Sequence, residues 1–286
     1  MTSTEVATLE DIQGMSEQEL MALTGQTEER SGLPRLAVNY NADDEDGNTL
    51  PRGAYRIDDP SQGGMTIYGA EAHFRPLFRV YSYSIWDQDA QKFTVQTVQA
   101  KNLGAPFPDT IGGNKCGKIS KAERDALDPK SAEAIFQSTI KCNQIFYGLV
   151  SIPNGTNVKG KKASCENIPC VWYVKGASFV PLGDYIKRLQ KENKPMFKVV
   201  SKLTTTRHKA GSGANAVTFF VAEATPLKEV EFTPEDQSLL GDFLKTIQGY
   251  NEHIMGQHNK AVAANATPEE IDMALDLEDD EEEVAA

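Results

Sequence analysis

Residues 74–87 have the sequence FRPLFRVYSYSIWD, and residues 92–101 have the sequence KFTVQTVQAK. In both stretches the residues that can be buried alternate with the others, and a period of two is typical of a strand with one buried face. The polar residues 87–91 between them indicate a turn. The two stretches therefore predict a β-hairpin.

Further strands are predicted at residues 144–152, 171–180, 196–206 and 216–223. Helices are predicted at 120–143, where Ser120 and Glu123 have capping-box spacing, at 182–192, and from Thr233 to about His258. The glycine-rich segments 111–117, 153–162 and 207–214 indicate loops. This order predicts a mainly β chain with helical additions (α+β). Its candidate architecture is an OB-like antiparallel barrel core, although other β folds fit the same pattern.

Composition divides the chain into four parts. We expect an acidic, partly irregular N-terminal segment at 1–64, a β-rich nucleic-acid-binding core at 65–225, a C-terminal helix at 226–260, and a disordered acidic tail at 261–286. The tail prediction depends on ten acidic residues without a single basic one, a density of like charge that opposes packing.

Charge is distributed very unevenly along the chain. The net charge is −12, but residues 1–60 carry −9, residues 61–140 carry +1, residues 141–209 carry +10 and residues 210–286 carry −14. The basic segment 141–209 can neutralise phosphates even though the whole protein is acidic. The charge pattern therefore favours nucleic acid as a partner.

Membrane and secreted classes are disfavoured. No apolar run approaches the roughly 18 residues that a membrane helix needs, and residues 1–20 carry acids where a signal peptide carries bases. We expect a protein without membrane contact that stays in the cytoplasm, which is the host cytoplasm if a bacteriophage encodes it.

Two constellations combine cations with aromatic rings, the mixture that single-strand binders use for phosphates and for stacked bases. One lies in the middle of the chain and the other in the first hairpin strand. The rings in both also have a plain alternative role in the core. Together the predicted nucleic-acid-binding residues are Arg75, Arg79, Tyr81, Tyr83, Trp86, Lys159, Lys161, Lys162, Trp172, Tyr173, Lys175, Lys198, Lys202, Arg207 and Lys209.

A basic body followed by an acidic C-terminus resembles the single-stranded-DNA-binding proteins of bacteriophages and bacteria. That resemblance implies an OB-fold core and a tail that recruits replication and recombination proteins while competing with DNA. It covers the architecture and no aligned motif, and the chain ends Val-Ala-Ala instead of in an aromatic residue. The predicted partner-binding residues are Asp276, Glu278, Asp279, Asp280, Glu281, Glu282 and Glu283.

Catalytic and metal motifs are weak. Cys116, Cys142, Cys165 and Cys170 match a tetrahedral zinc site in number but lack a C-x-x-C pair, so zinc binding stays open. The sequence lacks a P-loop, a G-x-S-x-G elbow and an H-E-x-x-H helix. We therefore expect neither an enzyme nor a cofactor.

The sequence favours a single-stranded DNA-binding protein that coats its strand with little sequence preference during DNA replication, recombination or repair. The alternative is a DNA-mimicking interaction or inhibitor protein that engages a nucleic-acid enzyme through its acidic ends. A preference between DNA and RNA, and the formation of a homo-oligomer, are left open.

Overall fold

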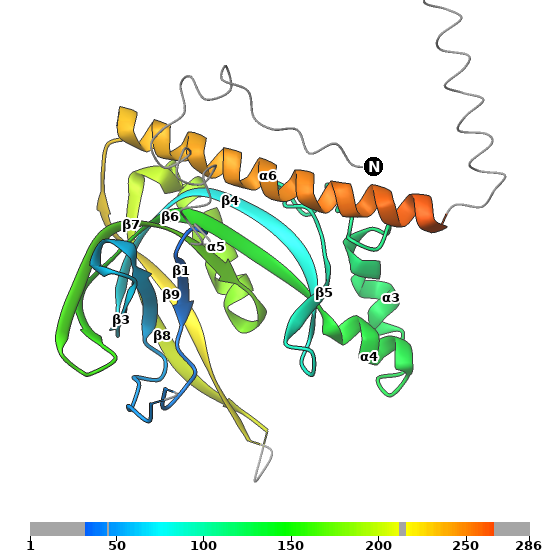
Figure 1. Cartoon of the computed structure of the whole chain (residues 1–286), viewed down its shortest axis with the longest axis horizontal. Coiled ribbons are helices and arrows are strands. Elements are labelled where there is room, and N and C mark those ends of the chain that lie inside the picture. Colours follow the sequence, from blue (N-terminus) through cyan, green and yellow to red (C-terminus); the bar gives the residue numbers. More distant parts are fainter. Residues whose placement is uncertain (1–31, 45, 212–215, 266–286) are drawn as a thin grey trace, which may run out of the picture. The chain divides into compact units, whose positions relative to one another are not determined.

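The computed structural model describes residues 32–44, 46–211 and 216–265 (Figure 1). Its strands are β1 (Arg35–Val38), β2 (Tyr55–Asp59), β3 (Met65–Gly69), β4 (Ala72–Asp87), β5 (Lys92–Gln96), β6 (Ile140–Asn157), β7 (Lys162–Val174), β8 (Val199–Ala210) and β9 (Val217–Glu229). Its α-helices are α3 (Lys121–Asp125), α4 (Ala132–Thr139), α5 (Phe179–Lys191) and α6 (Pro234–Asn265). Short 3-10 helices are η1 (Pro60–Gln62), η2 (Lys115–Gly117), η3 (Gly176–Ser178) and η4 (Met196–Lys198).

The strands pair in the order β3-β2-β1-β7-β6-β4-β8-β9, with β5 on β4 and an additional pairing between β3 and β6. Most neighbours are antiparallel, but β1 and β7 run parallel. The prediction of a mainly β chain with helical additions is confirmed. The sheet is mixed and does not form a clear barrel, because β4 pairs with β6 on one edge and with β8 on the other, so the sheet continues to β9.

The predicted hairpin exists as β4 and β5, with Ser84 opposite Gln96 and Asp87 opposite Lys92. Both strands of the pair β4–β6 are longer than the pattern suggested, and β6 continues to Asn157 through much of the predicted loop 153–162. Strand β8 likewise extends through Arg207 to Ala210. The two predicted basic loops are therefore the ends of β-hairpins.

The N-terminal segment contributes to the core more than its composition suggested. Leu36 of β1 and Tyr55 and Ile57 of β2 are each 0% exposed. Their strands lie in the same sheet as the segment that follows residue 65. Short strands flanked by Asp, Asn and Gly residues gave little periodic signal, so the sequence indicated irregular structure there.

The predicted helix at 120–143 is divided. Ser120 and Glu123 form the expected capping box at the start of α3, and Ser131 caps α4. Strand β6 begins at Ile140, so Cys142 and Asn143 are strand residues. Pro129 follows α3 and prevents one continuous helix, since proline disfavours helical geometry in the residue before it.

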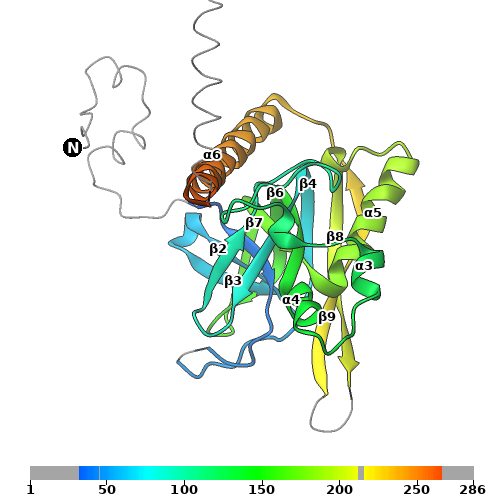
Figure 2. The same ribbon diagram turned by 90° about the vertical axis from the view of Figure 1, so that its right-hand side faces the viewer.

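Helices α5 and α6 cover opposite faces of the sheet (Figures 1 and 2). Phe146 belongs to the main core with Trp172 and with Leu182 of α5. The next residue, Tyr147, lies with its ring centroid 5.5 Å from that of Phe243 in α6. Because neighbouring strand residues face opposite ways, the two helices lie on different sides.

The predicted helix from Thr233 is α6, which continues to Asn265, beyond His258. Residues 261–265 of the predicted tail are therefore helical, and the remainder of the tail lies outside the described residues. Among the described residues, no helix combines the length and the apolar character needed to cross a membrane.

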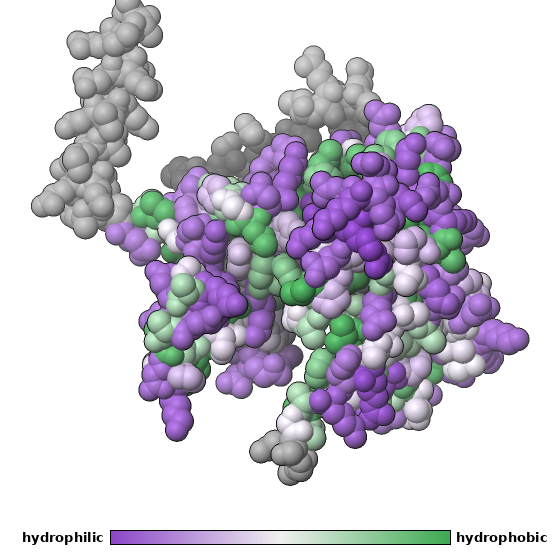
Figure 3. Space-filling model, turned by 180° about the vertical axis from the view of Figure 1, so that it is seen from behind, coloured by the Kyte–Doolittle hydropathy of each residue, from purple (hydrophilic) through white to green (hydrophobic). Residues whose placement is uncertain are grey.

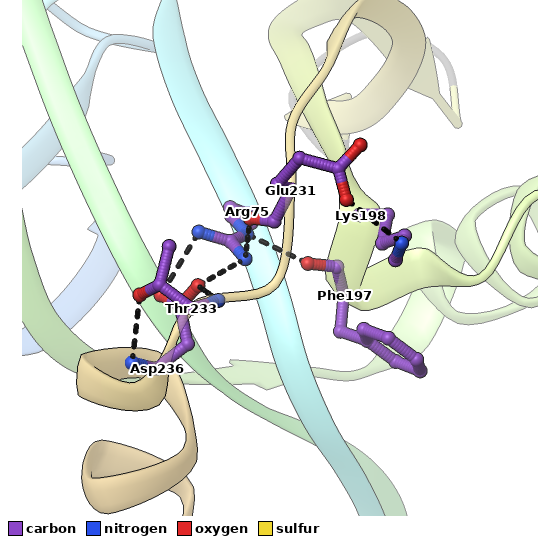
Figure 4. Close-up of polar contacts among 6 residues, drawn as sticks. All are labelled: Arg75, Phe197, Lys198, Glu231, Thr233 and Asp236. Atoms are coloured by element: carbon purple, nitrogen blue, oxygen red, sulfur yellow. Dashed lines mark hydrogen bonds and ion pairs between the residues drawn. The ribbon is translucent and has the colours of Figure 1, made fainter.

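Arg75 of β4 connects the sheet to the beginning of α6 (Figure 4). Its guanidinium donates to both carboxylate oxygens of Asp236, at 2.9 and 2.7 Å, and to the backbone oxygens of Phe197 and Glu231, at 2.7 and 3.2 Å. Asp236 also accepts from the backbone N–H of Thr233 at 2.9 Å. The side chains of Arg75 and Asp236 are only 11% and 9% exposed. Such a pair is costly to break, because either partner alone is a buried charge.

The environment of Asp236 makes its carboxyl group unusually acidic. Burial alone raises its pKa, but hydrogen bonds from Arg75 and Thr233 outweigh burial and hold the pKa below its usual value. The stabilisation is therefore complete above the pKa of the unfolded carboxyl, about 3.9, and is lost as the pH falls through the lower folded value.

We predict that Asp236→Asn lowers the free energy of unfolding at pH 7 by about 3 kcal/mol, because Arg75 stays buried without its counter-charge. Urea unfolding from pH 6 to pH 2.5 checks both parts. The wild type should lose more stability than the variant below about pH 4. The control is Asp242→Asn, whose side chain is 64% exposed and whose ion pair with Lys245 is 3.7 Å long. It should change stability by less than about 0.5 kcal/mol. Equal stability of wild type and Asp236→Asn at pH 7 would contradict the account.

Candidate nucleic-acid interface

Two of the predicted stacking residues lie in the core. Trp172 is 4% exposed, and its ring contacts those of Tyr55, Phe74 and Phe146. Tyr83 is 9% exposed, and its ring centroid lies 5.0 Å from that of Phe107. The prediction placed both rings at a binding surface, and the structure instead places them where a base can reach them only if the core opens.

Three of the predicted cations are already paired with carboxylates. Arg75 binds Asp236, Lys198 lies 3.1 Å from Glu231, and Lys202 contacts Glu71. Arg75 has its guanidinium fully engaged and so is a structural residue in this fold, which corrects its predicted place at the interface. Lys198 and Lys202 are partly exposed, but a phosphate would have to compete with their carboxylate partners.

The cations of the predicted basic loops lie at the ends of two hairpins. Lys159, Lys161 and Lys162 are exposed at the β6–β7 turn, and Arg207 and Lys209 are exposed near the end of β8. A hollow of about 420 Å³ lies between these hairpins. The residues that line it include Arg52, Tyr68, Asn154, Thr156, Thr205, Arg207 and Phe220. The structure thus brings parts of the two predicted loops to one hollow and adds Arg52, which sequence reasoning missed.

A second group of partly exposed side chains lies at the other end of β6. Tyr81 of β4 contacts a small core cluster of Tyr83, Val95, Phe107, Cys116 and Ile140, which we call the second cluster. On its other side the ring centroid of Tyr81 lies 6.2 Å from that of Phe179, at the start of α5. Figure 3 shows the surface hollowed between the part that carries α3 and α4 and the rest of the molecule. We call the site between the second cluster and α5 the Tyr81 groove, defined by Arg79, Tyr81 and Phe179.

Side chains in the Tyr81 groove suit a stacked base next to a phosphate. Tyr81 and Phe179 are both partly exposed, so the core does not bury their rings completely. The guanidinium carbon of Arg79 lies 5.5 Å from the ring centroid of Tyr81. Cations above aromatic rings and accessible ring faces are the elements of a single-strand site.

Two further aromatic groups lie near the same ends of the strands. Trp86 is 40% exposed and Phe93 is 43% exposed, with ring centroids 4.8 Å apart at the end of the β4–β5 hairpin. Tyr173 of β7 is half-buried beneath Arg35, whose guanidinium carbon lies 4.9 Å from the ring centroid. Phe93 and Arg35 were not predicted to take part.

Five cations form a row near the start of β6 and the end of β7. Arg35 and Lys141 lie close enough to Lys175 to lower its pKa, and Lys141 and Arg124 act in the same way on Lys118. Lys175 leads into η3 and α5, whereas the Nζ of Lys118 donates to the backbone oxygen of Ile140 in the second cluster, at 3.2 Å. Because neighbouring strand residues face opposite ways, Lys141 and Lys175 lie on the face of the sheet that α6 covers, opposite to Cys142, Gln144 and Val174. We call Arg35, Lys175, Lys141, Lys118 and Arg124 the cation row.

The cation row lacks carboxylate partners within the residues that the structure describes. Burial is the main cause of the lowered pKa of both Lys118 and Lys175, and the neighbouring cations lower it further. Cations held together in this way repel one another, and a bound polyanion removes that repulsion.

Sequence reasoning found Arg79, Tyr81 and Lys175 of this site but missed Arg35, Lys118, Arg124 and Lys141. The missed cations lie in β1, just after η2, in α3 and in β6, and each is ordinary in its local context. Only the parallel pairing of β1 with β7 and the packing of the η2 region on β6 bring them together. The predicted partner-binding residues 276–283 lie outside the described residues.

The cysteines fall into two separate groups. Cys116 belongs to the second cluster and Cys142 packs against it, whereas Cys165 and Cys170 belong to the main core. Burial raises the pKa of the Cys116 thiol to about 12 and also raises that of Cys142. Within the described part of the chain no cluster of ligating side chains suits a metal ion.

Comparison with known proteins adds no relationship. No protein-family model, curated protein or solved structure matches the chain.

We predict that Lys141→Gln raises the pKa of both Lys118 and Lys175. Removing a like charge favours the protonated form of each neighbour, so the direction is upward for both. Heteronuclear NMR titration of the lysine side chains measures the two values. Lys191→Gln, on the exposed side of α5, is the control and should leave both values unchanged. Unchanged values in Lys141→Gln would show that the cation row does not exist in solution.

Proposed function

We propose that the protein binds single-stranded DNA across the strand ends that carry the Tyr81 groove and the cation row, with the cations on the phosphates. The observation that carries the proposal is the row itself, in which Arg35, Arg124 and Lys141 lower the pKa of Lys118 or Lys175, at the same end of the strands as the partly exposed rings of Tyr81 and Phe179. Duplex DNA offers phosphates but no free base faces, so this combination favours a single strand. Its role would be to coat strands during DNA replication, recombination or repair.

Binding of this kind has little sequence preference and depends strongly on salt. Every base has a face that stacks on an aromatic ring, and stacking contributes about 1–3 kcal/mol per base. Each phosphate neutralised on a single strand releases condensed counterions and contributes about −0.7 to the slope of log K against log salt. Five cations in one row are thus enough for a steep dependence.

We also propose that the fold is a variant of the OB-like arrangement. The pairings link β1, β2, β3, β6 and β7 into a ring, because β3 pairs with β6 at Ile67–Asn157 and Tyr68–Thr156. A five-stranded ring supports the idea, since OB-type folds are five-stranded, partly open barrels that bind oligonucleotides. Strands β4, β8 and β9 would then be an extension of the sheet.

The acidic C-terminal segment is proposed to modulate binding and to recruit partner proteins. Residues 266–286 hold ten acids and no base. They follow α6, whose end lies beside the 109–118 loop: a ring nitrogen of His258 contacts the backbone oxygen of Asp109 at 2.9 Å. That loop leads to Lys118, so a segment of this length can reach the cation row and compete with phosphates.

Replacing the three lysines of the cation row tests the proposal. We predict that Lys118→Gln, Lys141→Gln and Lys175→Gln together weaken binding to a labelled dT strand on the order of 100-fold at low salt, and reduce the salt slope by about 2. Fluorescence anisotropy at several salt concentrations measures both quantities.

Two triple variants with the same charge change are the controls. Lys187→Gln, Lys191→Gln and Lys245→Gln remove exposed lysines from α5 and α6 and should have a much smaller effect. Lys159→Gln, Lys161→Gln and Lys162→Gln test the hairpin ends. If the hairpin variant loses the most binding, the interface lies at the other end of β6. If wild type binds no nucleic acid, the alternative of an interaction or inhibitor protein takes its place.

Removing residues 266–286 tests the acidic segment. We predict that the 1–265 chain binds single strands about tenfold more tightly at low salt, because an internal competitor for the cation row is gone. The difference should shrink at high salt, where screening weakens both interactions. Weaker binding by the truncated chain would contradict self-competition.

A further inference from the structure

Gln144 of β6 is a buried amide without hydrogen bonds. The residue is 1% exposed, and in the described structure neither its Nε2 nor its Oε1 has a partner. Other buried amides are bonded: the Nε2 of Gln137 donates to the backbone oxygen of Gly117 at 2.8 Å, and the Oε1 of Gln99 accepts from the hydroxyl of Tyr147 at 2.9 Å. Leaving both ends of an amide unpaired destabilises a fold, so the exception calls for a reason.

The amide of Gln144 lies at the Tyr81 groove. Gln144 is directly opposite Tyr81 on β4 and opposite Val174 on β7. Gly183 of α5 lies above it, and a Cβ placed on Gly183 would be 3.5 Å from Oε1. The amide is thus covered by the first turns of α5, at a position without a side chain.

The start of α5 follows directly from η3 and is joined to β9 through Ser178. Ser178 precedes the helix but provides no side-chain cap, because its hydroxyl accepts from the backbone N–H of Ala222 at 2.9 Å. Gly176 has a φ of 60° and open space around its Cα, which suits a hinge. Val180, in the first turn, is 63% exposed. Gly176 is therefore the position about which the start of α5 can pivot.

We propose that the first turn of α5 opens and admits one adenine base of the bound strand, which stacks between Tyr81 and Phe179 and pairs with the amide of Gln144. A glutamine amide presents a donor and an acceptor side by side. Adenine presents the matching pair, an acceptor at N7 and a donor at the N6 amino group. Arg79, at 5.5 Å from the Tyr81 ring, is in place for the neighbouring phosphate. This inference rests on the proposed function and adds a slight base preference at one nucleotide of the site.

Replacing Gln144 should raise the stability of the protein and remove its base preference. Gln144→Leu removes the unpaired amide, so the variant should melt at a higher temperature than wild type. It keeps the cation row, so it should still bind a pure dT strand with the salt dependence of wild type. It loses the base contact, so a preference for strands that contain a single dA should disappear.

The experiment measures competition binding of three strands to full-length wild type and Gln144→Leu. The strands are dT alone, dT with one central dA, and dT with one central 7-deaza-dA, which lacks the N7 acceptor. Wild type should prefer the dA strand by roughly tenfold over the other two, and Gln144→Leu should bind all three alike. Gln144→Met, unbranched like glutamine, replaces the leucine variant if that variant does not fold.

The outcomes distinguish this inference from the proposed function. If wild type binds all three strands equally, or if Gln144→Leu keeps the dA preference, the base site is wrong while single-strand binding stands. If wild type binds none of the strands, the proposed function and the base site fail together.

Discussion

The ion pair between Arg75 and Asp236 is the contact on which the arrangement of the sheet and α6 depends. One guanidinium in β4 binds the carboxylate that caps α6, the backbone of η4 and the backbone before the helix. Each partner is almost fully buried, so the pair forms completely or leaves a charge in a poorly solvated place. With α6 held on one face, β4 and β6 present their other face to α5 and the second cluster, and the Tyr81 groove lies between these two.

The electrostatics of the molecule follow from the fold and not from local sequence. Arg35, Arg124 and Lys141 come from β1, α3 and β6, yet between them they lower the pKa of Lys118 and Lys175. Their mutual repulsion lowers stability in the free protein, and a polyanion relieves it. The buried amide of Gln144, which lacks hydrogen-bond partners in the described structure, is a second unfavourable feature of the free protein. Both features destabilise the free protein, and a bound single strand offers a physical reason for keeping them together.

Much of the fold was predictable from periodicity and capping. The alternation in residues 80–86 and 92–101 predicted the hairpin that β4 and β5 form. The capping patterns at Ser120 and Thr233 predicted the starts of α3 and α6. Alternation separates the two faces of a strand but does not say which face is covered. Arg75 and Trp172 were therefore expected at the interface but are buried. Strands β1 and β2 escaped prediction because they are short and acquire their stability from long-range pairing.

The most direct test of the Tyr81 groove is ultraviolet crosslinking of the full-length protein to a bromodeoxyuridine-substituted single strand, with the crosslinked residues identified by mass spectrometry. The account predicts crosslinks to Tyr81 and Phe179, with fewer when salt is raised, since binding there depends on the cation row. Crosslinks confined to Phe219 and Phe220 in the β8–β9 hairpin, with none in the groove, would contradict it.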